Sequence, residues 1–441
     1  MRQCYRWGLA ILMLGTMAAC GPAKSNNHEG WNVNTNDNSN NGNNSDGGTI
    51  YPDAYVGPAA KLQGTVWGPG KLFPVSGAIV AAYTAPPEAI PDHVYCEPCA
   101  EPGVAHVFSN PDGSFELSVM PGGHFWLSVQ KGQFRHVQEY SVPGGAGTYV
   151  LTDDYTTLPS RTDPDKGDTI PKIALATGSY DHMEDIFGKV GMGSVDPADG
   201  TFDWGSEQGI FDVYDNGGDG SGPSFSDLLH DVNKMEQYHI IFVPCSDGVS
   251  DYTDSDVQDN MKQYVWDGGK WYIADWSEEW VNSAWPEFLD FGNCGSDWGT
   301  GDELDCDGSP EYDSVPGHAL DPDLAAWLAA QGISPDALSL EENWDEISGI
   351  HEGFVGYDPE HGQGPNHELY MLPRVWVEGP VDGATRPLTV SWPYNCGRVL
   401  YTTYHSVGAM GGTHSGLLPQ EEILFYLVME IGLCQDEVVV Q

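Results

Sequence analysis

The chain has 441 residues, and 17 Lys and Arg against 65 Asp and Glu give it a formal net charge of −48 at pH 7. Hydrophobic residues make up 40% of the chain, which is enough for folded cores and excludes a wholly disordered acidic protein. At about 100–200 residues per domain, this length predicts two or three domains. The acidic surplus excludes nucleic acid as a partner, because binding phosphate backbones needs a basic surface. It equally excludes docking on anionic lipid by charge.

Residues 1–19 have the pattern of an export signal. Arg2 and Arg6 supply the positive start, and residues 7–17 form an apolar stretch that is too short to span a bilayer. Small residues then precede Cys20, an arrangement that resembles the lipobox of bacterial lipoproteins. The resemblance implies that Cys20 is lipidated and becomes the mature N-terminus. Two or three acyl chains would anchor the protein stably in a membrane.

The residues around Cys20 predict where that anchor lies. Met17 stands where the lipobox usually has Leu, and the alternative is ordinary signal cleavage with Cys20 as a spare thiol. Gly21 rather than Asp follows Cys20, so the usual inner-membrane retention signal is absent. We therefore expect an exported lipoprotein of the outer membrane, on its periplasmic or cell-surface face. Residues 20–58 are expected to form a disordered tether, because residues 25–48 are almost all Asn, Ser, Gly and Asp and have no apolar face.

The cysteines fit an oxidising compartment. Of nine cysteines, Cys4 lies in the signal and Cys20 takes lipid, which leaves seven and hence one unpaired thiol. The disulfide candidates are Cys96, Cys99, Cys294, Cys306, Cys396 and Cys434. Short spacing favours pairing of the first two with each other and of the next two with each other. Cys245 is free if the last two pair, although a bond from Cys245 to either of them stays open. A zinc site at the first pair would lack a second pair of ligands nearby.

Residues 59–150 predict a β-sandwich. Short β-type runs alternate with Gly and Pro turns at a spacing of about ten residues, which is typical of sandwich folds. The turn at 110–113, Asn-Pro-Asp-Gly, places Pro where φ is preset and Gly where φ is positive. The predicted strands are 62–67, 78–83, 106–109, 114–119 and 124–129.

Several segments of this region resemble a carboxypeptidase regulatory-like domain, namely 64–66, 74–80, 112–117, 121–129 and 132–135. The resemblance implies a transthyretin-like sandwich of seven strands, grouped with carbohydrate-binding-like folds, that serves as a spacer or adhesion module. Trp67, His124 and Trp126 are candidate glycan contacts, with a place in the core as the alternative. No His-Glu-x-x-His motif occurs, and the one His-x-x-Glu spacing, from His136 to Glu139, falls inside the predicted sandwich rather than in the second region, so no accompanying carboxypeptidase is predicted.

Residues 166–435 change to an alternation of buried strands and helices, which predicts a doubly wound parallel sheet with helices on both faces. The expected strands are 172–177, 239–243, 271–274 and 398–404. The expected helices are 182–190, 226–235, 254–266, one from 277, and 420–431. In such sheets ligands bind beyond the carboxyl ends of the strands, which here carry Gly178, Cys245, Asp275 and His405.

This second region resembles the class I glutamine-amidotransferase-like superfamily in the broad sense that includes trehalose-utilisation-type domains. The matching segments are 238–244, 264–275 and 397–405. The resemblance implies a flavodoxin-like sheet, with His405 at the place of the family's base. The chain departs from the family at the nucleophile, because Asp275 stands where the family has its cysteine, and a carboxylate cannot replace a thiolate in that addition chemistry.

Three interpretations of the strand ends follow. Cys245 and His405 could form a nucleophile–base pair if Cys245 is free. Asp275 and His405 could perform acid–base chemistry. Alternatively, Asp275 simply caps the next helix through the amides of 277–280. An enzymatic interpretation requires the His405 ring to lie within about 7 Å of Asp275 or Cys245, which is the reach of a direct or one-water contact.

Acidic loops add a metal prediction. Asp215 with Asp219, and Asp305 with Asp307, space carboxylates before a glycine as calcium loops do, although neither loop has the glutamate that ends an EF-hand. Calcium is therefore the candidate ion, and no cofactor is required. Residues 291–396 form an excursion, with a helix at 322–330 and β-type runs at 373–378 and 387–392, that would suit a lid or partner surface.

These observations favour an exported, lipid-anchored, non-catalytic surface or envelope protein with a binding or structural role. Its partners would be the membrane through the lipid anchor and a glycan or protein at the cell surface. The alternative is a hydrolase acting on an extracellular glycan-derived or amide substrate. The missing nucleophilic cysteine and the lack of a complete triad signature favour the first.

Overall fold

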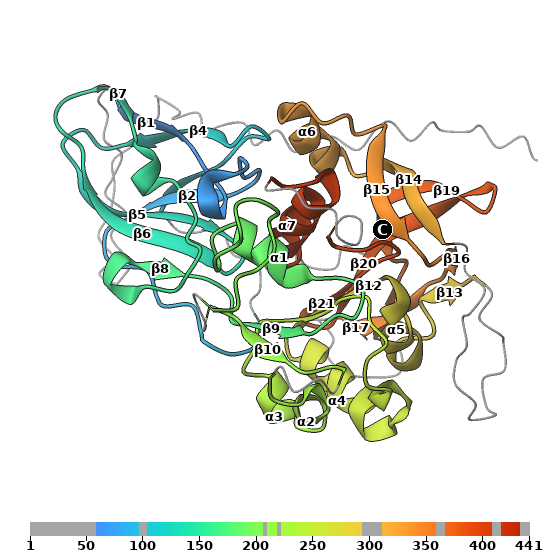
Figure 1. Cartoon of the computed structure of the whole chain (residues 1–441). Helices are drawn as coiled ribbons and strands as arrows, with labels where there is room; N and C mark the ends of the chain where they lie inside the picture. The colour runs from blue at the N-terminus through green and yellow to red at the C-terminus, as the bar shows by residue number, and fades with distance from the viewer. Residues whose placement is uncertain are drawn as a thin grey trace, which may run out of the picture. The chain divides into compact units, whose positions relative to one another are not determined.

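The computed structural model describes residues 59–96, 104–205, 210–217, 222–292, 311–358, 367–407 and 416–432. All of them belong to one unit that spans 55–441. This unit is mostly sheet, with several separate sheets and few helices (Figure 1). Among the described residues, none of the helices combines the length and the apolar character that a bilayer crossing requires.

The N-terminal part holds two sheets. One has the order β4-β1-β7, with bounds Ser114–Val119, Ala60–Thr65 and Gly147–Val150. The other has the order β3-β2-β5-β6-β8, with bounds Ala105–Phe108, Ile79–Tyr83, His124–Lys131, Phe134–Ser141 and Asp168–Thr169. Residues of both sheets, such as Leu62 and Leu127, belong to the same hydrophobic cluster, because alternate side chains of each strand point inward.

The predicted turn between the third and fourth strands is confirmed. Gly113 has φ +75° and donates its N–H to the carbonyl of Asn110 at 2.8 Å. Asp112 accepts hydrogen bonds from the backbone and the hydroxyl of Ser114, which fixes the start of β4.

The largest sheet has nine strands in the order β10-β9-β11-β12-β21-β20-β19-β14-β15. The bounds in that order are Asp212–Tyr214, Ile173–Ala176, Ile240–Val243, Lys270–Ala274, Gly397–Thr402, Ala384–Tyr394, Arg374–Val381, Tyr312–Ala319 and Leu338–Asn343. Neighbours from β10 to β21 are parallel, whereas those from β21 to β15 are antiparallel. The expectation of an all-parallel sheet is therefore wrong, because strands of the 291–396 excursion join the same sheet as a hairpin series. Two-stranded sheets pair β13 (Leu289–Phe291) with β16 (Ile347–Ile350), and β17 (Gly353–Tyr357) with β18 (Glu368–Met371).

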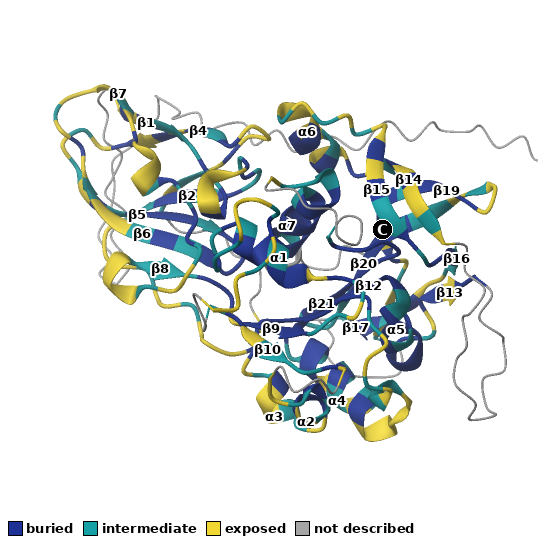
Figure 2. Ribbon diagram, viewed as in Figure 1, coloured by how far each residue is buried: buried dark blue, intermediate teal, exposed yellow. Residues whose placement is uncertain are grey.

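The helices largely follow the sequence pattern. They are α1 (Met183–Lys189), α2 (Phe225–Leu229), α3 (Val232–Met235), α4 (Ser255–Trp266), α5 (Glu279–Ala284), α6 (Pro322–Ala330) and α7 (Pro419–Ile431). Short 3₁₀ turns are η1 (Pro69–Lys71), η2 (Asp153–Tyr155), η3 (Pro164–Lys166), η4 (Asp251–Thr253) and η5 (Asp275–Ser277). The single helix expected at 226–235 is instead two, and the first begins earlier, where the Ser224 side chain caps it by accepting the N–H of Asp227. Most of α7 and the central strands are buried (Figure 2).

One disulfide joins the two regions. Cys96, on the connection between β2 and β3, bonds to Cys396 in the turn between β20 and β21. The predicted local pairing of Cys96 with Cys99, and the pairing of Cys396 with Cys434, are therefore wrong. The connection after β2 also contacts the residue before β11, where His239 Nε2 lies 2.9 Å from the carbonyl oxygen of Pro91.

Candidate active site

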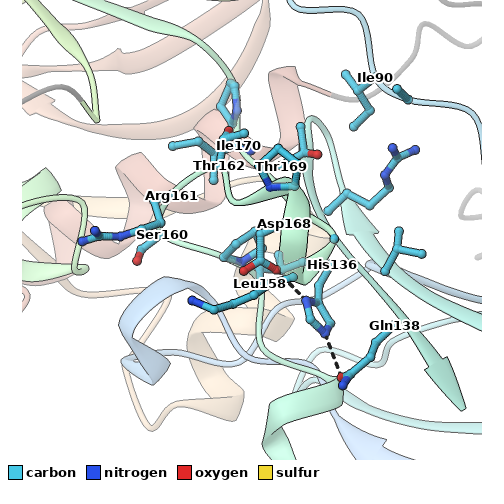
Figure 3. Close-up of a pocket in the computed structure, with 18 of the residues that line it drawn as sticks. Ile90, His136, Gln138, Leu158, Ser160, Arg161, Thr162, Asp168, Thr169 and Ile170 are labelled. Carbon is cyan, nitrogen blue, oxygen red and sulfur yellow. Dashed lines mark hydrogen bonds and ion pairs between the residues drawn. The ribbon is translucent and has the colours of Figure 1, made fainter.

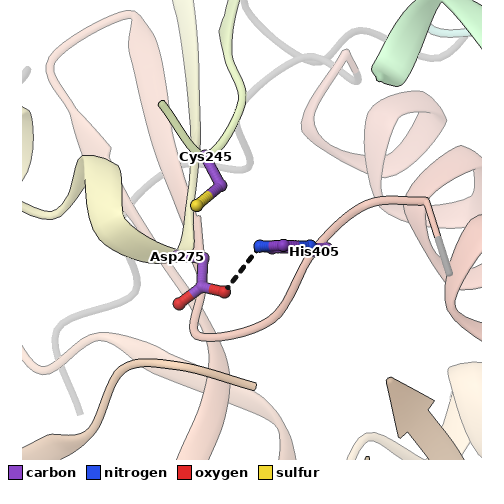
Figure 4. Close-up of side chains that lie close together, drawn as sticks. All are labelled: Cys245, Asp275 and His405. Carbon is purple, nitrogen blue, oxygen red and sulfur yellow. Dashed lines mark ion pairs between the residues drawn. The ribbon is translucent and has the colours of Figure 1, made fainter. Parts of the chain in front are cut away.

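Three predicted residues meet at one edge of the nine-stranded sheet. Cys245 follows β11, Asp275 follows β12, and His405 follows β21 (Figure 4). These strands are parallel neighbours, so their carboxyl ends open at the same edge, as the sequence pattern predicts.

The cluster of Cys245, Asp275 and His405 is tight and fully buried. His405 Nε2 lies 3.3 Å from Asp275 Oδ2, and one ligand atom from each of the three residues lies within 4.8 Å of the others. Their exposed fractions are 1% or less. Cys245 is a free thiol, which removes the alternative in which it forms a disulfide with Cys396 or Cys434. The distance condition for an enzymatic interpretation is met.

Asp275 sits on a sharp turn between strand and helix. Its φ is +50°, a left-handed conformation that few residues adopt easily. Its Oδ1 accepts the backbone N–H of Trp344 at 3.2 Å, and the Tyr401 hydroxyl donates to its carbonyl at 3.0 Å. The carboxylate makes no capping hydrogen bond to η5 or α5, so the helix-cap interpretation is wrong. Oδ2 is left facing the cluster without a hydrogen-bond partner.

Several backbone contacts hold His405 in place. Its N–H donates to the Glu342 carbonyl at 3.0 Å, and Gln420 Nε2 donates to its carbonyl at 2.9 Å. Asp181 accepts the next two backbone N–H groups, of Ser406 at 2.7 Å and Val407 at 3.0 Å. The ring is thereby directed at Asp275, and its buried Nε2 has no hydrogen-bond partner.

Sequence reasoning missed Asp181, although a signal for it existed. The residue lies three positions after Gly178, which was itself placed at a strand end. A Cβ at Gly178 would clash with the carbonyl oxygen of Asp181, so the turn after β9 needs glycine there.

Burial controls the protonation of the cluster. It raises the pKa of the Cys245 thiol well above its usual value, and the nearby Asp275 carboxylate raises it further. Burial likewise raises the pKa of Asp275, with Asp345 as the next cause. For His405, burial lowers the pKa. All three shifts favour the uncharged forms, since charge is costly away from water.

More carboxyls surround the cluster. Burial raises the pKa of Glu278 well above its ordinary range and that of Glu279 to about 7. Asp345 is 1% exposed and accepts a hydrogen bond from the Tyr401 hydroxyl. Glu278 Oε2 is buried with no hydrogen-bond partner. Burial therefore favours the protonated forms of these neighbouring carboxyls as well.

Half-buried aromatic rings lie beside the cluster. The rings of Trp276 and Trp344 are 5.0 Å apart, and that of Tyr180 lies 5.6 and 5.8 Å from them. Trp344 also packs edge-on against His405 at 4.4 Å. An isolated bridge between Asn343 and Tyr404 brings this part of the excursion to the strand ends. No periodic pattern in the sequence links position 344 to position 405.

The other predicted site residues lie apart from this cluster. Trp67 is half-buried between bridges to Pro74 and Thr157, whereas His124 and Trp126 share one face of β5. Asp215 is half-buried, and its Oδ1 accepts the N–H of Gly217 at 3.1 Å. The predicted residues outside the described ranges are Cys20, Cys99, Asp219, Cys294, Asp305, Cys306, Asp307 and Cys434.

A groove of about 1530 Å³ lies elsewhere, between the N-terminal sheets and the start of the larger one (Figure 3). Its lining includes Trp126, His136 and Asp168. The latter two are cross-strand neighbours with Nδ1 and Oδ1 2.6 Å apart. No residue of the strand-end cluster lines this groove. We take the strand ends as the site, because unpartnered buried groups converge there.

Comparisons with known proteins give no family assignment. No family model and no curated protein matches the chain. Similar solved structures include two cytoplasmic proteins from Salmonella typhimurium, at 13% and 12% identity, covering 60% and 59% of this chain and 97% and 98% of theirs, with TM-scores of 0.31 and 0.34. A ThuA-like protein from Bacteroides uniformis is 12% identical over 60% of this chain and 92% of its own, with a TM-score of 0.32. It shares its family name with the trehalose-utilisation resemblance, but a likeness of this degree carries no argument about function.

Proposed function

We propose that this chain is an exported, lipid-anchored envelope protein whose strand-end cluster hydrolyses an external substrate, glycan-derived or amide. The observation that carries the proposal is the convergence of Asp275 and His405 at 3.3 Å beside the free thiol of Cys245. Because of this convergence we favour the hydrolase over the non-catalytic role that the sequence favours.

The fold assignment is part of the proposal. Within the larger sheet, the parallel neighbours run β10-β9-β11-β12-β21, which in their own chain order is 2-1-3-4-5, the flavodoxin-like order. This order supports an amidotransferase-like domain. The shared core of the two N-terminal sheets supports a transthyretin-like sandwich in front of it.

The chemistry follows from the groups present. Hydrolysis needs a group that activates water and a place that holds the substrate. Asp275 and His405 offer the first, since each directs a buried, unpartnered polar atom at the other. The rings of Tyr180, Trp276 and Trp344 offer the second, because half-buried aromatic surfaces suit the apolar faces of sugar rings. Water adds to the carbon of the scissile bond, and its proton passes to the leaving oxygen or nitrogen.

The test is turnover of a panel of chromogenic glycosides and amides by the full chain. Asp275→Asn and His405→Asn should each lower the rate by about 10²–10⁴-fold, the contribution typical of such groups. Asp168→Asn, in the His–Asp pair of the groove, is the matched control and should leave the rate unchanged. Turnover that survives both site variants would falsify the proposal. Saturable binding of a glycan without turnover would return the chain to the non-catalytic role.

Membrane fractionation of Cys20→Ser tests the anchor, with release to the soluble fraction expected.

A further inference from the structure

The strand-end cluster has an unusual hydrogen-bonding deficit. Asp275 Oδ2 and His405 Nε2 are fully buried and have no hydrogen-bond partner, although they lie 3.3 Å apart. Buried polar atoms in proteins are nearly always satisfied. Two such atoms directed at one point, with the Cys245 sulfur beside them, indicate a ligand that accepts electron pairs.

We propose that Cys245, Asp275 and His405 bind one divalent transition-metal ion, with Zn²⁺ as the best match. Sulfur, imidazole nitrogen and carboxylate oxygen are the ligands zinc uses in proteins. Calcium and magnesium take oxygen ligands instead, so this site differs in kind from the acidic loops.

The spacing of the ligand atoms fits this ion. Zinc–ligand bonds of about 2.0–2.3 Å in tetrahedral geometry place ligand atoms about 3.3–3.6 Å from one another. The separation between His405 Nε2 and Asp275 Oδ2 is 3.3 Å, and the Cys245 sulfur lies within 4.8 Å of both.

Charge and support also fit. A thiolate and a carboxylate balance the two positive charges of the ion, so the loaded site is neutral and its burial is not penalised as a net charge would be. Binding releases the thiol proton of Cys245, and the carboxyl proton of Asp275 where it is present, to solvent. Two outer contacts steady the ligands, since the Trp344 N–H donates to Asp275 Oδ1 and Asp181 accepts the N–H of Ser406 next to His405.

Three protein ligands leave a fourth position for water, which the ion would activate. This consequence rests on the proposed hydrolase function, but the binding of the ion does not.

The experiment titrates Co²⁺, a spectroscopic substitute, and Zn²⁺ into the full chain after chelator treatment. We expect one bound equivalent and a thiolate-to-cobalt charge-transfer band in the near ultraviolet. Cys245→Ser should abolish that band while keeping the shape of the side chain. Asp275→Asn and His405→Asn should each weaken metal binding by about 10–100-fold or more, because loss of a direct ligand costs at least as much as loss of a residue that orients one. His136→Asn is the matched control and should bind as the parent does, and thermal melts verify that each variant is folded.

The outcomes separate this inference from the proposed function. Absence of the band in the parent chain, or its persistence in Cys245→Ser through other thiols, overturns the metal site. Hydrolysis that persists in the metal-free chain shows that the ion does not activate the water, and it leaves the hydrolase function standing. Metal binding without turnover of any substrate leaves the site intact and removes the function.

Discussion

His136 with Asp168 and His405 with Asp275 are the same pair of residue types in two regions of the molecule. The first pair joins neighbouring strands, β6 and β8, at 2.6 Å, and its side chains are 11% and 15% exposed. The second joins no strands, is 1% and 0% exposed, and leaves a nitrogen and an oxygen without hydrogen bonds. A His–Asp pair that stabilises a sheet makes its hydrogen bonds, whereas a pair in a functional site can have buried polar atoms without hydrogen-bond partners.

The acidic residues of the two regions differ in the same way. In the N-terminal region, hydrogen bonds from Ser114 and Lys166 lower the pKa values of Asp112 and Asp163. In the larger region, burial raises the pKa of Asp185 to about 6 and that of Glu422 to about 7. Hydrogen bonding therefore favours the charged form of these two N-terminal carboxyls, whereas burial favours the uncharged form of the two in the larger region.

The largest expected effect on stability comes from cutting the disulfide between the regions. The Cys96–Cys396 bond spans a sequence separation of 300, so it restricts the unfolded chain strongly. Replacing both cysteines by serine should lower the free energy of unfolding by about 2–5 kcal/mol, measured by urea denaturation. Cys245→Ser, which leaves the bond intact, is the control. An unchanged midpoint in the double variant would show that the regions do not depend on this link.

The two His–Asp pairs should respond with opposite signs to loss of the carboxylate. In the metal-free chain, Asp275→Asn should raise the free energy of unfolding by about 1–3 kcal/mol, because it replaces a buried ionisable group, whose Oδ2 lacks a hydrogen-bond partner, by one that carries no charge. Asn also tolerates the left-handed backbone at this position. Asp168→Asn should lower stability by about 1 kcal/mol, since a charge-assisted hydrogen bond becomes a neutral one. Thermal melts with a chelator present measure both, and shifts of the same sign would contradict the distinction between the pairs.

Local sequence patterns predict which strand ends form the site, but not the residues that contact it from elsewhere in the chain. Alternating buried strands and helices placed Cys245, Asp275 and His405 at one edge, because parallel strands align their carboxyl ends. The partners that decide the roles of these residues come from elsewhere in the chain. Trp344 lies on the excursion and supplies the N–H that excludes the helix-cap role of Asp275.

The fold shows the same limit of local patterns. The turn at Gly113 and the helix α6 follow from local preferences and are confirmed. The disulfide and the antiparallel half of the large sheet depend on pairings across long stretches of chain. Hydrophobic periodicity carries no information about such partners.

The smallest expected effect is a pH dependence of the free energy of unfolding, which arises from the buried carboxyls of the larger region. A carboxyl whose folded-state pKa is raised binds more protons when folded, so its contribution is present at low pH and lost as pH rises through the folded value. For Asp185, Glu279 and Glu422 those values are about 6 to 7, against ordinary values of 3.8 to 4.5. The free energy of unfolding of the metal-free chain should therefore fall between about pH 4 and about pH 7.

A single variant isolates one of these groups. Glu422→Gln should make the fall in the free energy of unfolding with pH less steep. The change in slope should be less than about 1.4 kcal/mol per pH unit, the value for one full proton, since solvent screens this half-buried side chain. Asp163→Asn is the counterpart in the N-terminal region, where hydrogen bonding to Lys166 lowers the pKa and confines the effect to acidic solution. Urea denaturation across the pH range measures both. An equal change of slope above about pH 5 in the two variants would mean that both regions treat their acids alike.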